Sequence, residues 1–433
     1  MEKPPDIRLP QESAGDSSNG LLPMQHVETL IIGGGQAGLA MSYHLQRLGR
    51  EHLILERTNV ADRWRTQRWD SLMFQFPNWS ISLPGHAYSG ESPDGFSDRD
   101  AVLRFIEDYA VSIRAPVKTR TNVTALQPAA CGNRYLVVSD DGEFVVRNVV
   151  VATGPYQRPH VPPMSAGIAN DILQLHASDY RNPSALPDGA VLVVGSGASG
   201  CQIADELLEA QRRVYLSVSR HDRLPRRYRG RDVLSWLVLL GHYETAIDEL
   251  PEELRTARFL FTGVRGGYDI DLRRSESNGM TLLGHLADID DSRLSLTTDL
   301  EQNLDGADTS YRAFLRAVDE HVSKTGIEAP LAVDERARST PRAVDIGVEL
   351  DMRAAGIRSV VWATGYRFDF NWVALPIFNP HGAPIQRRGV TAAPGVFFLG
   401  LKRLHTLKSS LLCGVGDDAA YLAELIAGTA YRP

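Results

Sequence analysis

Two short apolar runs along the chain are each followed by the same spacing of glycines. Residues 27–32 and 190–194 are these runs, and both are rich in β-branched side chains. The glycines behind them follow the pattern G-x-G-x-x-G and are Gly33, Gly35, Gly38, Gly195, Gly197 and Gly200. A helical apolar pattern comes next, so each copy predicts a buried strand, a tight turn and a helix. This is the beginning of a dinucleotide-binding βαβ unit, and the chain contains it twice.

Each glycine of the motif has its own physical role. The first permits the turn, the second lets the backbone approach a pyrophosphate, and the third lets the helix pack closely on the strand. The helix N-terminus presents free amides and a partial positive charge to the phosphates. We therefore expect nucleotide contacts from the glycines and from residues that open each helix, namely Gln36, Ala37, Ser196 and Ser199.

The end of the second strand in each unit indicates which nucleotide binds there. In the first unit the apolar run 52–55 ends at Glu56, which can accept hydrogen bonds from ribose hydroxyls. A solvated strand-end carboxylate is the alternative. The second unit has Arg220 at the corresponding place, which suits the 2′-phosphate of NADPH. Further arginines reinforce this hypothesis, although a solvated basic loop would have the same composition: Arg223, Arg226, Arg227, Arg229 and Arg231.

An irregular, aromatic stretch fills residues 59–90. No single period fits its large side chains, which are Trp64, Trp69, Phe74, Phe76, Trp79 and Tyr88. A long segment without regular structure inside a compact domain is usually functional. We expect this stretch to cover a redox cofactor, with Trp64 near the entrance. The alternative is that these aromatic side chains fill the core.

Other elements follow from local signals. Ser97 and Asp100 form a capping-box pattern ahead of an apolar helical stripe, and residues 135–146 alternate as a hairpin. Helices are also predicted at 236–240, 310–325 and 417–426, and strands at 280–283 and 395–400. The stretch 244–278 fits neither pattern.

Two strands that end in small residues suggest how the chain divides. Strand 148–151 runs into Ala152-Thr153-Gly154, and strand 359–362 runs into Ala363-Thr364-Gly365. Small residues at such an exit let the chain pass closely under a nucleotide. Prolines between residues 155 and 163 mark a stiff linker after the first exit. We therefore expect the second unit to begin after this linker and the chain to return to the first near the second exit.

Composition narrows the class of protein. The chain has 433 residues, is 43% hydrophobic and carries a formal charge of −7, which gives no footprint for nucleic acid or a membrane surface. No apolar run reaches the roughly 18 residues of a membrane span, and no signal-peptide pattern opens the chain. Three cysteines without C-x-x-C spacing argue against disulfides and a redox dithiol. We expect a cytoplasmic protein without a metal site.

Taken together, the motifs resemble those of the two-dinucleotide-binding flavoproteins, and within them the group-B, flavin-containing-monooxygenase type. The second half of that family's fingerprint between the glycine motifs matches His176 to Tyr180, while its first half departs. Tyr180-Arg181-Asn182 is similar to the branch that oxidises heteroatoms and indole acids, because a Trp-Pro ending would suggest the Baeyer–Villiger branch. Trp362 to Tyr366 is also typical of the family.

The resemblance implies an α/β fold with two Rossmann-like dinucleotide-binding domains, the NADPH domain inserted into the FAD domain as in glutathione reductase. The expected segments are a disordered tail at 1–26, the FAD domain at 27–160 and 356–433, and the NADPH domain at 161–355. Alongside the glycine motifs, the predicted cofactor contacts are Glu56, Arg57, Trp64, Val123, Thr153, Gly154, His176, Tyr180, Arg220, Thr364 and Gly365.

The resemblance also implies a reaction. NADPH reduces FAD, O2 adds to the reduced flavin as a hydroperoxide, and one oxygen atom passes to a small organic substrate. The protein then needs polar contacts near the flavin rather than an acid–base dyad. Candidates for that role are Asn78, Gln75, His405 and Lys408. A flavin reductase without oxygen transfer, a Baeyer–Villiger enzyme and a redox sensor remain alternatives, and a homo-oligomer is possible.

Overall fold

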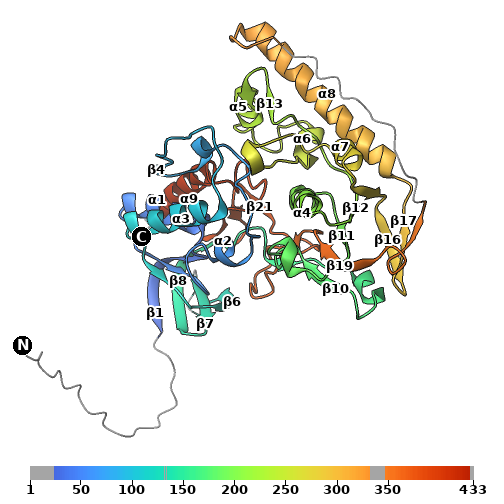
Figure 1. Ribbon diagram of the computed structural model, residues 1–433. Coiled ribbons are helices and arrows are strands. Elements are labelled where there is room, and N and C mark those ends of the chain that lie inside the picture. Colours follow the sequence, from blue (N-terminus) through green and yellow to red (C-terminus); the bar gives the residue numbers. More distant parts are fainter. Residues whose placement is uncertain (1–23, 131, 133, 332–346, 430–433) are drawn as a thin grey trace, which may run out of the picture.

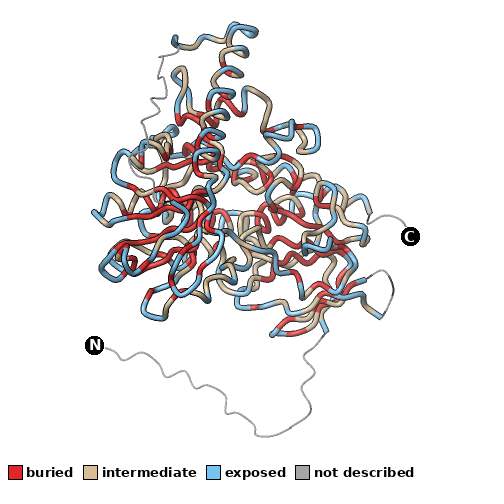
Figure 2. Tube along the Cα trace, turned by 90° about the vertical axis from the view of Figure 1, so that its right-hand side faces the viewer, coloured by how far each residue is buried: buried red, intermediate tan, exposed pale blue. Residues whose placement is uncertain are grey.

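The computed structural model describes residues 24–130, 132, 134–331 and 347–429. Positions 1–23 of the predicted tail lie outside the described residues, whereas Gln25 and His26 already belong to the first strand. The chain forms two bodies, each centred on parallel strands with helices against them (Figure 1). Buried positions lie inside the molecule, and exposed ones lie mostly along its outer loops (Figure 2). The two sheets have separate clusters of buried side chains, so each body has its own core.

The first sheet has the strand order β21-β22-β23-β8-β1-β2-β5. In its middle, β1 (Gln25–Ile32) pairs in parallel with both β2 (His52–Leu55) and β8 (Gly142–Val151). The predicted hairpin is confirmed, since β7 (Tyr135–Ser139) pairs antiparallel with β8. The other strands are β5 (Val117–Lys118), β6 (Val123–Pro128), β21 (Gln386–Arg387), β22 (Val390–Thr391) and β23 (Val396–Phe398).

Both faces of the first sheet are covered, which explains why its central strand is apolar at consecutive positions. Ile31 packs into the core beneath helices α1 (Gln36–Arg47), α3 (Arg99–Ser112) and α9 (Val415–Thr429). Leu30 and Ile32 point the other way, into a core that contains Phe370. Successive side chains in a strand face opposite sides, so a strand buried on both faces cannot alternate with polar residues.

The cap of α3 differs from the prediction by one residue. Asp98 is the N-cap, and its carboxylate accepts a hydrogen bond from the Ala101 amide at 2.7 Å. The hydroxyl of Ser97, which the capping-box pattern assigned to this role, donates instead to Oδ1 of Asn78 at 2.7 Å. The helix itself lies where its apolar stripe predicts.

The second sheet has the strand order β10-β19-β11-β12-β15. Its βαβ unit, β11 (Ala190–Val194), α4 (Ala198–Glu209) and β12 (Val214–Ser217), forms as predicted. The strand β19 (Ile357–Trp362) pairs with β11 and with β10 (Leu173–His176). The expected boundary at residue 356 therefore moves beyond Trp362, because a strand followed by Ala-Thr-Gly signals a strand exit without telling which sheet holds the strand.

The two crossings between the bodies run side by side. The outgoing segment β9 (Arg158–Pro159) pairs antiparallel with the returning segment β20 (Tyr366–Arg367). The His160 amide extends this ribbon by donating to the Gly365 carbonyl at 2.9 Å. All strands of the second sheet lie, along the chain, between β8 and β21 of the first.

The rest of the second body lies around α8 (Leu300–Thr325), which runs along its outer edge (Figure 1). This helix begins ten residues before the predicted start, and Leu300, Leu304 and Ala307 continue its buried stripe. Helix α5 (Val233–Leu239) likewise begins before residue 236, and the unassigned stretch contains α6 (Glu252–Thr256), η4 (Val264–Gly266) and α7 (Leu272–Ser277). The remaining strands of the second body are β13 (Arg227–Tyr228), β14 (Arg231–Asp232), β15 (Thr281–Leu283), β16 (Leu286–Asp290), β17 (Arg293–Leu296) and β18 (Glu349–Asp351).

Short elements complete the chain. The aromatic stretch is mostly loop but carries α2 (Asp62–Thr66), η1 (Asn78–Ser80), β3 (Ser82–Leu83) and β4 (His86–Ala87). Two 3-10 turns, η2 (Pro163–Gly167) and η3 (Pro183–Ala185), flank β10.

Candidate cofactor and active site

A cavity of about 560 Å³ opens where the first glycine motif meets the aromatic stretch and the N-terminus of α4. Its wall includes twelve of the residues predicted from sequence: Gly33, Gly35, Gln36, Ala37, Glu56, Arg57, Trp64, Gln75, Val123, Thr153, Gly154 and Ser199. Ser199 of the second glycine motif therefore faces the same space as the first motif.

The first glycine motif leaves room for a ligand at its middle position only. A Cβ on Gly33 would lie 2.6 Å from the Ala152 carbonyl oxygen, and one on Gly38 would lie 2.0 Å from the Gly33 carbonyl oxygen. A Cβ on Gly35 would meet nothing within 4 Å. Gly35 is also the N-cap of α1, and no side chain caps that helix. Open space in front of uncapped amides fits a pyrophosphate.

Glu56 lies on the cavity wall at the end of β2, as predicted. Its Oε2 accepts a hydrogen bond from the Gly34 amide at 2.7 Å, and Oε1 accepts one from the Thr58 amide at 3.0 Å. These bonds fix the carboxylate beside the glycine turn. A carboxylate can accept further bonds, so its position suits a ribose diol.

The second glycine motif repeats this design. A Cβ would lie 2.7 Å from the Ala363 carbonyl oxygen at Gly195 and 1.9 Å from the Gly195 carbonyl oxygen at Gly200. At Gly197, the uncapped N-cap of α4, it would meet nothing within 4 Å. The Ser196 hydroxyl is engaged with the backbone of Ser219, donating to its carbonyl and accepting from its amide at 3.0 Å. Ser196 therefore connects the glycine turn to the segment that follows β12, while Ser199 faces the cavity.

Of the arginines after β12, Arg220 forms no ion pair with the described residues, and its contact with a 2′-phosphate stays a prediction. Its side chain is exposed and contacts the Thr256 hydroxyl at 3.2 Å. Arg223 is paired with Asp271 and Asp308, Arg226 with Asp232, and Arg229 with Asp319. The two other arginines donate to backbone carbonyls, Arg227 to Gly266 and Arg231 to Glu328. The cluster is thus mostly internal ion pairing, which its spacing in the sequence could not reveal.

The fingerprint residues His176 and Tyr180 lie outside the cavity wall. The Ser178 amide donates to Nδ1 of His176 at 3.1 Å, which leaves Nε2 to donate to the Gly365 carbonyl at 3.0 Å. His176 is only 4% exposed, and burial lowers the pKa of its side chain. The Tyr180 hydroxyl donates to Glu206 at 2.8 Å within the core of the second body.

These contacts make the fingerprint a brace for the second strand exit. The Thr364 hydroxyl donates to the His160 carbonyl, and Gly365 lies at a φ of +83° with nothing within 4 Å of an added Cβ. His176 also meets the ring of Tyr366 edge to face, with centroids 4.9 Å apart, and Tyr366 lines the cavity. The fingerprint reaches the cavity through this neighbour.

Of the four predicted catalytic candidates, only Gln75 lines the cavity. The Asn78 amide is buried and bonded to the Ser92 carbonyl and the Ser97 hydroxyl, so it organises its own loop. The His405 backbone amide donates to the Ser409 hydroxyl at 3.0 Å. Neither Asn78 nor His405 lines the cavity, so no contact found there supports their predicted catalytic role.

Lys408 forms ion pairs with Glu244 at 2.6 Å and Asp417 at 2.8 Å, away from the cavity wall. Burial opposes its charge, but the two carboxylates outweigh burial and raise the pKa of Lys408. This lysine joins the second body to α9. The neighbouring Ser410, by contrast, lines the cavity and accepts a hydrogen bond from the Gln36 side chain at 2.8 Å.

Sequence reasoning missed a cationic and aromatic part of the cavity wall. The Arg68 guanidinium lies over the rings of Trp64 and Tyr156, at 5.3 and 5.6 Å from their centroids. Burial, followed by the charge of Arg57, lowers the pKa of Arg63 to about 10. Arginines in an aromatic loop carry no periodic signal, and only the fold brings them to the cavity.

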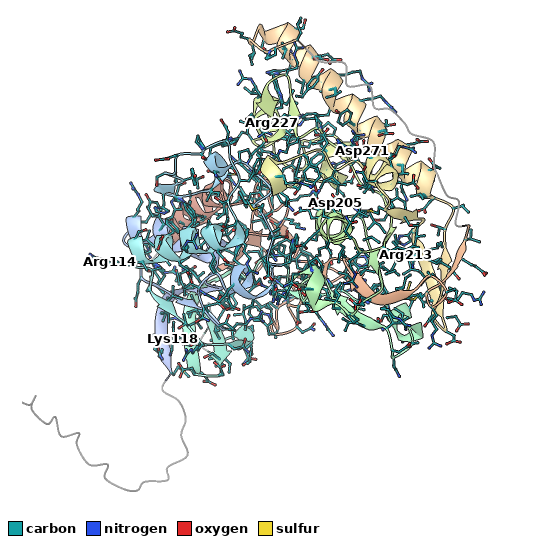
Figure 3. All side chains as sticks on the ribbon, in the orientation of Figure 1. Arg114, Lys118, Asp205, Arg213, Arg227 and Asp271 are labelled. Atoms are coloured by element: carbon teal, nitrogen blue, oxygen red, sulfur yellow. The ribbon has the colours of Figure 1, made fainter. Side chains whose placement is uncertain are left out.

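A second hollow, of about 460 Å³, lies between α4 and α7 near the labelled Asp205 and Asp271 (Figure 3). Burial raises the pKa of Asp205 despite hydrogen bonds from Tyr268 at 2.9 Å and Ser275 at 3.4 Å. None of the predicted site residues lines this hollow. Within the described part of the chain, no group of acidic, histidine or cysteine side chains could hold a metal ion, and no helix is long and apolar enough to cross a membrane.

Comparison with known proteins identifies the class. The pyridine nucleotide-disulphide oxidoreductase family matches residues 30–239. An uncharacterized CzcO-like oxidoreductase from Geobacillus kaustophilus is 33% identical over 403 residues, covering 92% of this chain and 98% of its own. The chain belongs to the CzcO-like oxidoreductases. The resemblance to flavin-dependent monooxygenases drawn from the motifs is confirmed.

More distant similarities agree with this assignment. A probable indole-3-pyruvate monooxygenase, YUCCA3 of Arabidopsis thaliana, is 28% identical over 190 residues, which is 41% of this chain and 43% of that protein. The solved structure of a flavin monooxygenase from Stenotrophomonas maltophilia superposes with a TM-score of 0.66 at 20% identity, covering 94% of this chain and 99% of that one. The latter likeness concerns the fold.

Proposed function

We propose that this CzcO-like oxidoreductase is an FAD- and NADPH-dependent monooxygenase that transfers one oxygen atom from O2 to a small organic substrate. The observation that carries the proposal is the single cavity lined by both Gly35 and Ser199. Two nucleotide motifs that open on one space can bring a nicotinamide and a flavin together. Hydride transfer between them requires such proximity.

The first body is the FAD domain of this proposal, and the body inserted between β8 and β21 is the NADPH domain. The amides around Gly35 would hold the pyrophosphate of FAD, and Glu56 its ribose. The amides around Gly197 would hold NADPH, and Arg220 would contact the 2′-phosphate, for which a guanidinium is well shaped. The open space in front of both N-cap glycines supports these assignments.

Bound FAD, once reduced by NADPH, supplies the O2 activation that protein side chains lack. The chain itself orients the reactants and excludes water. Trp64, Phe74 and Phe76 form an aromatic series along the cavity, with centroids 6.3 and 5.9 Å apart between neighbours. The Gln75 side-chain amide has no hydrogen-bond partner among the described residues, so we assign it the polar contact to the reacting rings.

The main alternative is an NADPH-dependent flavin reductase without oxygen transfer. A disulfide reductase needs a reactive thiolate. Among the cysteines that the structure describes, Cys201 is buried with a raised pKa, and burial raises the pKa of Cys413 to about 11. Neither of these cysteines lines the cavity, which argues against disulfide chemistry there.

Stopped-flow absorbance distinguishes the two functions. Enzyme reduced by NADPH is mixed with O2, and the spectrum is followed until oxidised flavin returns. We expect a distinct transient before the oxidised spectrum. Immediate return of oxidised flavin would contradict the monooxygenase and favour the reductase. Product mass after turnover with an amine, an aryl sulfide, a cyclic ketone or an aryl pyruvate then identifies the substrate class and tests the Baeyer–Villiger alternative.

A further inference from the structure

A buried arginine of the second body contacts the backbone of the cavity wall in the first. The Arg226 side chain is only 3% exposed, and its Nη1 donates to the Gln75 carbonyl at 2.8 Å. Gln75 belongs to the aromatic stretch and lines the cavity. The two residues are 151 positions apart in sequence, so this bond joins the bodies directly.

Every donor of this guanidinium is occupied. Nε and Nη2 bind the Asp232 carboxylate at 2.6 to 2.9 Å, and Nη1 also points to the Thr262 carbonyl at 3.4 Å. Asp232 is fixed in turn, since it is the N-cap of α5 and accepts from the Leu234 amide at 2.9 Å. A guanidinium has five N–H donors in a rigid plane, so its geometry is fully determined by these contacts.

The packing around Arg226 restricts the same stretch of cavity wall. Its guanidinium lies over the Phe96 ring at 4.8 Å, and the Phe261 ring packs against Phe76 in a tilted arrangement with centroids 5.5 Å apart. A Cβ on Gly263 would lie 2.1 Å from the Phe74 carbonyl oxygen, so the second body approaches this backbone closely. The residues before and after Gln75 are thus packed, while the Gln75 side chain has no hydrogen-bond partner among the described residues.

We infer that Arg226, fixed by Asp232, is a positioning residue that sets the place of Gln75 in the active-site wall and makes that place depend on the docking of the NADPH domain against the FAD domain. The inference rests on the proposed function, because it assigns a consequence for oxygen chemistry to a contact between the bodies. Arg226 touches neither cofactor nor substrate in this scheme and acts only through the Gln75 backbone.

The test compares Arg226→Lys, which keeps the charge but loses the planar fork, with its parent. Each protein is loaded with FAD and supplied with NADPH and O2 without substrate. Hydrogen peroxide release is measured per flavin. We expect about a tenfold increase in Arg226→Lys, since small misplacements of a positioning group have effects of that order or larger. Asp232→Asn, which keeps an oxygen acceptor, should give a smaller increase in the same direction.

A matched control is Arg229→Gln, on the turn between β13 and β14. It breaks the ion pair with Asp319 of α8, and none of the hydrogen bonds or ion pairs of Arg229 reaches the cavity wall. Its peroxide release should equal that of the parent. Unfolding in urea and FAD content show whether any variant has lost its fold. If Arg226→Lys does not fold, the outcome for Asp232→Asn decides.

A double-mutant cycle separates positioning from general stability. Gln75→Ala removes the side-chain amide whose place Arg226 is inferred to set, so Arg226→Lys should add less than about twofold in that background. The inference would be overturned if Arg226→Lys raised peroxide release equally with Gln75 and with Ala at that position. It would also be overturned if neither Arg226→Lys nor Asp232→Asn raised peroxide release. The proposed function is tested separately on the parent enzyme. If the parent does not oxidise NADPH or shows no transient with O2, the proposed function itself has failed.

Discussion

A methyl group added at Gly35 should weaken FAD binding and leave the fold nearly intact, whereas one added at Gly38 should destabilise the fold. In Gly35→Ala the new Cβ meets nothing within 4 Å, and the residue has extended backbone at φ −90° and ψ −172°. The variant should fold, with a loss of about 0.5–1 kcal/mol for alanine at an N-cap. In Gly38→Ala the Cβ would lie 2.0 Å from the Gly33 carbonyl oxygen, which the helix cannot accommodate without leaving the strand. Strain of this kind costs about 1–3 kcal/mol or more.

Gly35→Ala, the variant expected to fold, should bind FAD more weakly than the parent. The Gly35 methyl would occupy the space in front of the α1 amides and displace a phosphate from at least one of them. A hydrogen bond to a charged group contributes about 1.5–3 kcal/mol. At 1.4 kcal/mol for each tenfold change, the dissociation constant of FAD should rise about 10- to 100-fold.

Two measurements on protein stripped of flavin check this prediction. Urea unfolding gives the stability of the parent, Gly35→Ala and Gly38→Ala, and fluorescence titration gives the FAD dissociation constant of each folded protein. If Gly35→Ala binds FAD as tightly as the parent, the space in front of Gly35 does not hold the pyrophosphate. A Gly38→Ala protein as stable as the parent would refute the packing argument.

Three further outcomes are expected. Arg220→Ala should raise the KM for NADPH strongly and leave that for NADH almost unchanged, and equal losses with both in steady-state kinetics would contradict the 2′-phosphate contact. His176→Ala should bind FAD normally but release more peroxide per NADPH oxidised, because the Gly365 carbonyl and the Tyr366 ring lose their brace; an unchanged ratio would make the brace purely structural. Burial lowers the pKa values of His176 and His221 from 6.5, so the unfolded chain binds more protons than the native one. Stability should be full above about pH 6.5 and fall below it, and a urea midpoint independent of pH between 7 and 5 would refute this sign.

The glycine motifs could be predicted from sequence because their chemistry is local. A turn, a close approach and a helix start all depend on residues within one short segment, and Gly33 to Gly38 lie where their spacing indicates. The position of Glu56 could be predicted for the same reason, because it directly follows the apolar run that forms β2. The strand pairing of β19 could not be found, because it is set by partners more than 160 positions away along the chain.

The cavity wall shows the same limit at the level of side chains. Sequence favoured Asn78 over Gln75, yet the amide of Asn78 is used within its loop while Gln75 faces the cavity. Arg226 looked like one member of a phosphate-binding cluster, and it is the buried partner of Asp232. Burial decides both cases, and in an irregular segment no periodicity reports burial.

The paired crossings have a consequence for how such an enzyme can be altered. Because β9 and β20 lie side by side, the chain leaves the first body and re-enters it at one place. Omitting residues 160–365 leaves two ends that already meet and can be joined by a short turn. The second body can therefore be replaced as a unit by that of a relative. The replacement must fit the β9–β20 ribbon and the surface where the two bodies meet, but it leaves the strand pairing of the first sheet unchanged.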